Sequence, residues 1–389
     1  MISSLRGGGS ERQTLLLLKH LDRQRFTPHL YLVDRAGALL DQLPDDVVVH
    51  AYSDRPPSGG WYYPGRELRR QSQHVHSVLL DNDIRAVYDR TFQMSLIAAQ
   101  PAGRLGVPRV STIVSPPHLA VPLVEKRFVQ LKKRRLIQAY RSSAQVVAVS
   151  QQAADSAVAY YQLGSTDVRV IPNPVDHATV QSAATESVAT ETSSAAGPRF
   201  VCVARMTEEK GHEDLLLALG QVDSLPEVVV PNLTIDLIGD GPLRESLQRQ
   251  WQSQSHRHHV HFHGAIENPV PWIARADALV LPSRFEGMPN VVLEAMALST
   301  PVIATRSGGT LDLERECPTI WWAQPANPSS LAGAIESFFG GGVEVQQRVD
   351  AAFEMTQVHH DVHQTVREIE SLMATVIDSS HSSGRRNAT

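Results

Sequence analysis

Two carboxylates stand eight positions apart in the segment Arg284-Phe285-Glu286-Gly287-Met288-Pro289-Asn290-Val291-Val292-Leu293-Glu294-Ala295-Met296. Glu286 precedes Gly287 and Pro289, which interrupt regular structure, whereas Glu294 falls about one turn inside an apolar-periodic helix. The first turn of a helix offers unpaired N–H groups and attracts phosphate. The two carboxylates can accept hydrogen bonds from hydroxyls on opposite sides of a bound diphosphate. The segment therefore predicts a sugar-nucleotide site, although the same spacing also occurs in a solvated loop followed by an ordinary helix.

Around this segment, short β-rich runs alternate with helical patterns along the whole chain. Such alternation is typical of an α/β fold whose parallel sheets are covered by helices on both faces. A chain of 389 residues is too long for one hydrophobic core, so two domains are expected. The expected strands are residues 29–33, 47–51, 85–89, 109–113, 145–150 and 168–171 in the first half, and 200–204, 234–239, 260–264, 278–282, 302–305 and 319–322 in the second.

The domain boundaries are expected where composition changes. Residues 178–198 are rich in Ala, Ser, Thr and Glu and predict a flexible insertion near the domain junction. The glycine turn at residues 7–9 follows only six residues, so the first strand is expected to be short or truncated. The expected parts are an N-terminal domain over 1–172, the junction with its insertion over 173–198, a C-terminal domain over 199–357, a C-terminal helix over 358–378 and a disordered tail over 379–389.

Composition excludes several classes of protein. The net charge of −5 argues against a nucleic-acid partner, which would require a broad basic surface. The longest apolar runs are far shorter than the roughly 20 residues that span a bilayer. Cys202 and Cys317 are interpreted as free thiols of a cytoplasmic protein, because two cysteines without a signal-like segment make no disulfide framework. Any membrane association is therefore expected to be peripheral.

Two cations follow an expected strand in Val203-Ala204-Arg205-Met206-Thr207-Glu208-Glu209-Lys210-Gly211. They would lie in the crevice where open α/β sheets bind ligands. Arg205 can donate forked hydrogen bonds to phosphate oxygens, and Lys210 adds a compact second charge. Together they can stabilise a leaving diphosphate without a metal. No Asp-x-Asp pair occupies a suitable loop, so neither a divalent metal nor another cofactor is expected.

These segments and two others, residues 170–176 and 239–243, occur in the same order in a known family. The chain resembles a retaining glycosyltransferase of the GT-B fold, in carbohydrate-active family four, also described as glycosyl transferases group 1. The resemblance implies two Rossmann-like, doubly wound domains that face each other across a cleft. The first would bind the acceptor and the second a nucleotide sugar, and the C-terminal helix would cross their junction. It also implies a role in the synthesis of a polysaccharide, a lipopolysaccharide or a glycolipid.

The resemblance assigns roles to individual residues. Arg205 and Lys210 would hold the donor diphosphate, Glu294 would bind the ribose and Glu286 would contact the donor sugar. His118, which follows the strand at 109–113, would be the acceptor-side histidine. The implied catalytic residues are Glu286, Arg205, Lys210 and His118, and the implied donor-binding residues are Gly9, Arg205, Lys210, Gly287, Met288, Asn290, Val291 and Glu294.

A basic helical pattern suggests where a membrane could be contacted. Residues 126–136 carry six cations interleaved with apolar Phe128, Leu131 and Leu136. A basic amphipathic helix is typical of a protein that binds anionic lipid at the inner face of a membrane, where lipid-linked acceptors are also found. The same pattern fits a solvated helix that simply covers the core.

Three rival functions remain open. A nucleotide-sugar epimerase or hydrolase of the same architecture would release product without an acceptor. A nicotinamide oxidoreductase is opposed by the turn at residues 7–9, which lacks the Gly-x-Gly-x-x-Gly spacing. A catalytically silent binding subunit is supported only by the short first strand.

Overall fold

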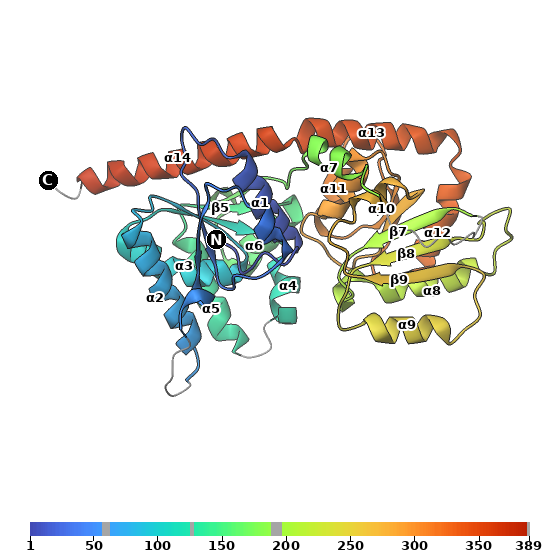
Figure 1. The fold of residues 1–389 in the computed structure, drawn as a ribbon, viewed down its shortest axis with the longest axis horizontal. Coiled ribbons are helices and arrows are strands. Elements are labelled where there is room, and N and C mark those ends of the chain that lie inside the picture. Colours follow the sequence, from blue (N-terminus) through green and yellow to red (C-terminus); the bar gives the residue numbers. More distant parts are fainter. Residues whose placement is uncertain (57–62, 125–127, 188–196, 387–389) are drawn as a thin grey trace. The chain divides into compact units, whose positions relative to one another are not determined.

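The computed structural model describes residues 1–56, 63–124, 128–187 and 197–386. The chain divides into two compact units. The first contains residues 1–173 together with the C-terminal segment that begins at Val362, and the second contains Pro174–Asp361. Each unit has its own parallel sheet, and helices cover the sheet (Figure 1). The predicted α/β class with parallel sheets is therefore confirmed.

The second unit contains a six-stranded sheet in the order β12-β11-β10-β7-β8-β9. Every neighbouring pair is parallel. Counted from β7, this is the strand order of a doubly wound dinucleotide-binding domain, in which the chain builds outward from the centre first to one side and then to the other. The strands are β7 (Arg199–Val203), β8 (Thr234–Ile238), β9 (His259–Gly264), β10 (Ala278–Leu281), β11 (Val302–Thr305) and β12 (Trp321–Ala323).

Continuous apolar runs explain why these segments are central strands. Strands β8, β10 and β11 are buried at every position, because helices cover both faces of a parallel sheet. Helices α8 and α12 pack on one face, and α10 and α11 lie on the opposite face (Figure 1). The helices of this unit are α7 (His177–Ala183), α8 (His212–Val222), α9 (Arg244–Gln252), α10 (Val270–Ala274), α11 (Asn290–Ala297), α12 (Pro328–Gly340) and α13 (Val343–His359), with short 3-10 turns η4 (Glu208–Lys210) and η5 (Gly308–Leu313).

The first unit contains a four-stranded parallel sheet in the order β3-β4-β5-β6 and a parallel pair, β1-β2. Where a short first strand is expected, a single parallel bridge joins Ile2 to Leu32. The strands are β1 (His29–Leu32), β2 (Val48–Ala51), β3 (Val87–Arg90), β4 (Arg109–Ile113), β5 (Gln145–Ala148) and β6 (Val168–Val170), and the helices are α1 (Gly9–His20), α2 (Arg66–Asp81), α3 (Phe92–Leu105), α4 (Pro117–Val124), α5 (Val129–Arg141), α6 (Gln151–Tyr161) and α14 (Val362–Arg386).

The C-terminal helix α14 is part of the first unit. Ile369, Leu372 and Val376 of this helix join Val110 and Val147 of the sheet in one buried cluster. The opposite face of the same strands packs on α5 and α6. Helix α13 ends at His359, and α14 starts at Val362 and continues to Arg386. It thus runs through most of the stretch 379–389 expected as a disordered tail, since each residue added to an existing helix gains one backbone hydrogen bond.

The expected insertion at 178–198 begins with regular structure. Asp176 caps helix α7 by accepting a hydrogen bond from the backbone N–H of Thr179 at 3.1 Å. This cap stabilises helix α7 despite its weak composition. Residues 188–196, in the middle of the expected insertion, lie outside the described part of the chain.

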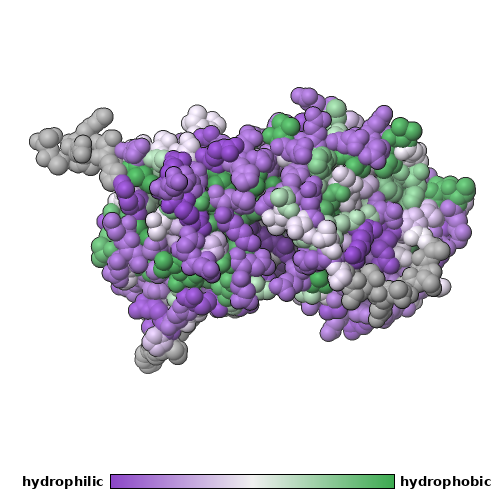
Figure 2. Space-filling view, turned by 45° about the horizontal axis from the view of Figure 1, so that its top comes forward, coloured by the Kyte–Doolittle hydropathy of each residue, from purple (hydrophilic) through white to green (hydrophobic). Residues whose placement is uncertain are grey.

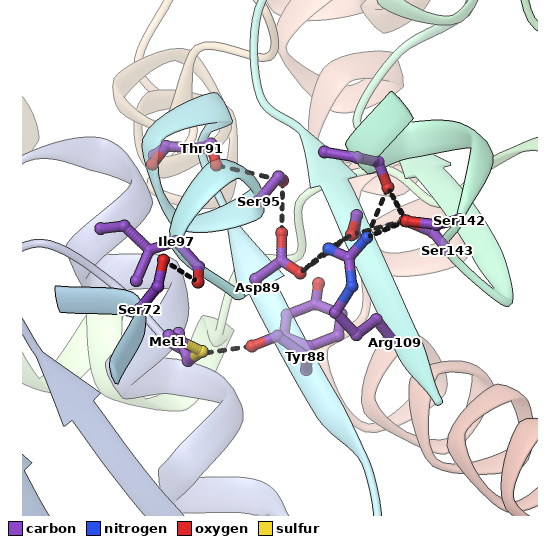
Figure 3. A network of polar contacts seen from close by, with 12 residues as sticks. Met1, Ser72, Tyr88, Asp89, Thr91, Ser95, Ile97, Arg109, Ser142 and Ser143 are labelled. Atoms are coloured by element: carbon purple, nitrogen blue, oxygen red, sulfur yellow. Dashed lines mark hydrogen bonds and ion pairs between the residues drawn. The ribbon is translucent and has the colours of Figure 1, made fainter. Parts of the chain in front are cut away.

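A buried ion pair joins the neighbouring strands β3 and β4 of the first unit (Figure 3). Nη1 of Arg109 lies 3.1 Å from Oδ2 of Asp89, and both side chains are almost wholly buried. Ser95 and Ser111 donate hydrogen bonds to the carboxylate, and the guanidinium donates to three groups in residues 139–143. A buried charge pair is tolerated only when its remaining polar atoms are also satisfied, and this network meets that condition.

The surface shown in Figure 2 is mainly hydrophilic, with hydrophobic side chains scattered among the polar ones. None of the described helices combines the length and the hydrophobicity needed to cross a membrane. Exposed large apolar side chains are nevertheless concentrated in one part of the first unit. Five of the 13 in the described residues lie between positions 119 and 131.

Candidate functional site

The candidate site lies at the switch point of the second sheet. Strands β7 and β10 are neighbours in the sheet. The strand that follows β7, β8, lies on one side of this pair, and the strand that follows β10, β11, lies on the other side. Ligands of open α/β sheets bind in the crevice outside the carboxyl ends of such strands. The loops after these two strands contain the residues predicted to bind the diphosphate and the donor sugar, Arg205, Lys210 and Glu286.

Lys210 and Glu286 contact each other across this point. Nζ of Lys210 donates to Oε1 of Glu286 at 2.6 Å, and Oγ of the buried Ser283 donates to the same oxygen at 2.7 Å. The Glu286 side chain is 11% exposed and that of Lys210 is 23% exposed. Two donors converge on one carboxylate oxygen, so the position and orientation of Glu286 are fixed before any ligand binds.

Two glycines allow the loops to approach this closely. Gly211 has a φ of +66°, and a Cβ atom there would collide with the carbonyl oxygen of Pro282. Gly308 has a φ of +61°, and a Cβ atom there would collide with the backbone carbonyl of Glu286. Only glycine combines a positive φ with the absence of a side chain. The turns after β7, β10 and β11 are thus packed backbone against backbone.

Arg205 lies two residues beyond β7 and is exposed. Its side chain forms no hydrogen bond or ion pair with any other residue that the structure describes. Its backbone is nonetheless held in place, because the next residue, Met206, donates to the carbonyl of Asp240 at 3.0 Å. An unpaired guanidinium on an ordered loop can bind a phosphate group without first breaking an internal ion pair.

Arg284 ties the two loops together from the side. Its Nε and Nη2 donate to the two carboxylate oxygens of Asp214 at 3.1 Å and 3.3 Å, and its Nη1 donates to Glu208 at 3.3 Å. Its backbone N–H donates to the carbonyl of Glu209 at 2.8 Å. The hydrogen bond to Asp214 raises the pKa of the guanidinium. Arg284 thus pairs with Glu208 and Asp214, the carboxylates that precede and follow Lys210 in the sequence. Lys210 pairs with Glu286 instead.

The remaining residues predicted to bind the donor follow Glu286 along the chain. Helix α11 begins at Asn290, directly after Pro289, and Glu294 lies one turn inside it. Residues four apart on a helix share a face, so the side chains of Asn290 and Glu294 are neighbours. Met288 is buried. One continuous segment of loop and helix therefore follows Glu286 in the sequence. It contains Gly287, Met288, Asn290, Val291 and Glu294.

His118, the predicted acceptor-side histidine, and Gly9, a predicted donor-binding residue, both belong to the first unit. His118 is the second residue of α4 and is exposed, and its Nδ1 lies 2.6 Å from Oγ of Ser156. Gly9 is the first residue of α1. The preceding turn is ordered by Glu11, which accepts hydrogen bonds from the backbone N–H of Gly8 at 2.7 Å and from Oγ of Ser4.

Three contributors were missed from the sequence. Ser283 could have been found, because it follows directly after an expected strand. Arg284 could not, since its partner Asp214 lies 70 residues away. His212 is buried, and neither ring nitrogen has a hydrogen-bond partner among the described residues. Burial, with a smaller contribution from the charge of Lys210, lowers the pKa of His212 to about 4.

No group of three or more His, Cys, Asp or Glu side chains in the described ranges is arranged to hold a metal ion. Three of the five histidines in residues 256–263 instead pair with aspartates. His256 lies 2.7 Å from Asp223, and His263 lies 2.7 Å from Asp236. Independence of the site from metals stays a prediction.

Comparison with known families covers most of the chain. Residues 7–179 match the family described as glycosyltransferase family 4, and residues 197–340 match the family described as glycosyl transferases group 1. Together the two matches show a glycosyltransferase of the family 4 type. The predicted recognition of this family is confirmed, and both loops of the candidate site fall within the group 1 match.

Relatives of this family 4 glycosyltransferase include the lipopolysaccharide core biosynthesis glycosyltransferase LpsE of Rhizobium meliloti. It is 30% identical over 139 residues, which cover 36% of this chain and 38% of the relative. Glycogen synthase of Mycobacterium tuberculosis is 28% identical over 220 residues, which cover 54% of this chain and 49% of the relative. The chain thus spans less than half of the length of each of these curated relatives.

Solved structures match the family 4 chain over nearly its whole length. The Anabaena protein Alr3699/HepE, solved in complex with UDP-glucose, has a TM-score of 0.74 at 20% identity, with 96% of this chain and 99% of that chain covered. WaaG, a glycosyltransferase involved in lipopolysaccharide biosynthesis, has a TM-score of 0.66 at 14% identity, with 96% and 99% covered. These likenesses confirm the predicted GT-B fold with two Rossmann-like domains.

Proposed function

We propose that the protein transfers a sugar from a nucleotide-diphosphate sugar to an acceptor hydroxyl, with retention of configuration. The observation that carries this proposal is the Lys210–Glu286 pair, held at 2.6 Å at the switch point of the second sheet with Arg205 unpaired on the same loop as Lys210. Cations beside a fixed carboxylate suit a ligand that combines a diphosphate with hydroxyl groups. The complex of the Anabaena protein with UDP-glucose supports the same class of donor.

In this reaction the bond between the anomeric carbon and the diphosphate oxygen breaks, and its electron pair leaves with the nucleotide diphosphate. The sugar becomes oxocarbenium-like in the transition state. Arg205 and Lys210 stabilise the negative charge that grows on the leaving phosphate. The acceptor oxygen attacks the same face of the sugar, and its proton passes to the leaving phosphate. Neither step requires a metal or another cofactor.

Glu286 is proposed to orient the donor sugar. One of its carboxylate oxygens already accepts from Lys210 and Ser283, and a carboxylate has further acceptor sites for sugar hydroxyls. Glu294, one turn inside α11, is proposed to bind the ribose hydroxyls. Gly287, Met288, Asn290 and Val291 would present loop backbone and the start of the helix to the sugar and the phosphates.

The first unit is proposed to contribute His118 to the acceptor side and Gly9 to binding of the donor phosphate. His118 is exposed, and its Nδ1 is oriented by Ser156, which leaves Nε2 to face a ligand. Gly9 opens helix α1, whose N-terminal N–H groups favour negative charge. The proposed acceptor is a carbohydrate or a lipid-linked sugar of polysaccharide, lipopolysaccharide or glycolipid synthesis.

The proposed location is the cytoplasm, at the inner face of the membrane. Its support is the state of the cysteines, since Cys202 is buried and Cys317 exposed and both are free thiols. Free thiols are typical of a reducing compartment.

Thermal-shift measurements with UDP-, GDP- and ADP-sugars test the donor, because the correct one should raise the melting temperature. Transfer is then measured with that donor and a panel of acceptors, and the anomeric configuration of the product is read by NMR. Unchanged rates in excess EDTA would support independence from metals. Release of free sugar without an acceptor would instead favour a hydrolase, and failure of every nucleotide sugar to bind would refute the proposal.

A further inference from the structure

Helices α4 and α5 of the first unit expose an unusual concentration of apolar side chains. Leu119, Leu123 and Val124 on α4 are 38%, 45% and 66% exposed. Phe128 and Leu131, at the start of α5, are 64% and 49% exposed. We refer to these five residues, with Arg134 and Arg135, as the α4–α5 surface.

Helical spacing places these residues on shared faces. Leu119 and Leu123 are one turn apart on α4. Leu131 on α5 is followed three and four positions later by Arg134 and Arg135, so a leucine and two cations form one exposed stripe. The opposite side of α5 packs into the core through Leu136, Ala139 and Tyr140. The apolar stripe is therefore additional to the face that the fold itself requires.

Phe128 is held in an unusual backbone conformation. It precedes α5 with a φ of +56° and a ψ of +33°, in the left-handed region. Bulky residues avoid this region because of steric strain. Residues in sparsely populated backbone conformations concentrate at functional positions. An exposed phenylalanine in such a conformation therefore indicates a contact surface.

The charge of α5 complements an anionic partner. Residues 129–141 contain five cations and no carboxylate, although the whole chain has a net charge of −5. Arg134 and Arg135 are exposed and form no ion pair with other described residues. Lys133 lies over the ring of Tyr160 at 4.1 Å. Lys126 and Arg127 of the predicted segment 126–136 lie outside the described residues, whereas residues 128–136 and α4 are described.

We infer that the α4–α5 surface docks on an anionic lipid bilayer. Apolar side chains enter the boundary between headgroups and acyl chains, while neighbouring cations attract anionic headgroups. Exposed leucines and a phenylalanine beside unpaired arginines match both requirements. A nucleic-acid partner would be matched by the cations but not by five exposed apolar side chains, most of which are aliphatic.

Docking at this surface has a consequence for the acceptor, which rests on the proposed function. His118, the proposed acceptor-side residue, precedes Leu119 directly and belongs to the same helix. Insertion of Leu119, Leu123 and Val124 would therefore hold His118 close to the headgroup layer. A lipid-linked acceptor could then reach the histidine while its chains remain in the bilayer.

The test is sedimentation of the full-length protein with vesicles of phosphatidylcholine alone or with added phosphatidylglycerol. The wild type should sediment with the anionic vesicles, and less so at high salt. Neutralising Arg134→Gln and Arg135→Gln should weaken binding roughly fivefold for each cation removed. Leu123→Asp and Phe128→Asp should each weaken it about tenfold, because they remove inserted apolar area.

Matched controls lie elsewhere on the same unit. One control is Leu80→Asp, at a leucine of α2 that is 61% exposed, and the other is Arg104→Gln, at an exposed arginine of α3. Both controls should bind like the wild type. Equal binding by all variants, equal losses in the controls, or no preference for anionic vesicles would overturn the inference.

Two further readouts separate this inference from the proposed function. Thermal shift by the nucleotide sugar should be unchanged in the α4–α5 variants, which shows that they fold and that the donor site is intact. Failure of donor binding in the wild type would refute the proposed function but would leave lipid binding measurable. A lipid-independent dimer that Phe128→Asp dissociates would assign the surface to a second copy of the chain and overturn the docking proposal.

Discussion

Nζ of Lys210 lies 2.6 Å from Oε1 of Glu286, although 76 positions separate the two residues in the sequence. The contact joins the loop after β7 to the loop after β10, where the direction of the sheet's crossovers reverses. Each partner defines the position of the other. A ligand that brings a diphosphate and a sugar to this point meets a cation and a carboxylate that are already ordered.

Lys210→Ala should lower kcat about 10²- to 10³-fold, because it removes a cation from the leaving group and one of the two donors that orient Glu286. Lys210→Arg should retain part of the activity, since it keeps the charge but changes its geometry. Steady-state kinetics measure both effects. Lys19→Ala, at an exposed lysine of the first unit, is the control and should match the wild type.

Arg205→Ala should also lower kcat about 10²-fold, but without a measurable loss of stability. The reason is that the Arg205 side chain has no partner among the described residues, so its removal leaves no group unsatisfied. Chemical denaturation and kinetics should be measured on the same preparation. Normal turnover in this variant would rule out a role for Arg205 at the leaving phosphate.

Glu294→Ala should weaken binding of the nucleotide sugar, because the proposed acceptor for the ribose hydroxyls is lost. Isothermal titration should show a loss of about 1.5–3 kcal/mol, the range for a hydrogen bond to a charged group. Glu294→Gln should recover part of this affinity. Equal affinity for the wild type and Glu294→Ala would place the ribose elsewhere.

Arg284→Ala should impair activity because it changes the position of the loop that carries Lys210. Arg284 is not expected to contact the substrate itself. Loss of the arginine leaves the carboxylates of Asp214 and Glu208 unpaired beside the loop that carries Lys210. Stability should fall by about 1–3 kcal/mol and kcat should fall more than KM rises. Arg284→Lys should restore stability only in part, because a lysine cannot make the forked contact with Asp214. A variant with normal kcat but lower stability would make the role purely structural.

Stability should fall with acidification below neutral pH, because of His212. Its folded pKa of about 4 lies below the ordinary 6.5, so the unfolded state binds more protons between these values. The contribution of neutral His212 is complete above pH 6.5 and is lost as the pH falls toward 4. Its size is about 3 kcal/mol. His212→Leu should show a flatter dependence on pH in denaturant titrations from pH 7 to 4.5, and an unchanged slope would contradict the assignment.

The twelve strands that the structure describes could all be predicted from the sequence, most of them because parallel strands buried on both faces appear as short apolar runs separated by turn residues. The cations Arg205 and Lys210 could be placed for the same reason, since a strand end locates the crevice. Contacts between distant segments could not be predicted. Neither Arg284 with Asp214 nor Lys210 with Glu286 leaves a local pattern, because 70 and 76 positions separate the partners. The exposure of Leu119 and Leu123 depends on which neighbours cover α4.

The order of strands in the second sheet determines when the proposed donor site can form during synthesis on the ribosome. Strands β7, β8 and β9 can pair as soon as they emerge, and Lys210 is then already present. The other edge of β7 stays open until β10 arrives, and an open strand edge is a template for aggregation. Arrival of β10 closes that edge and delivers Ser283 and Glu286 in the same event. A nascent chain in which Lys210 pairs with Glu286 has therefore already covered this edge of β7.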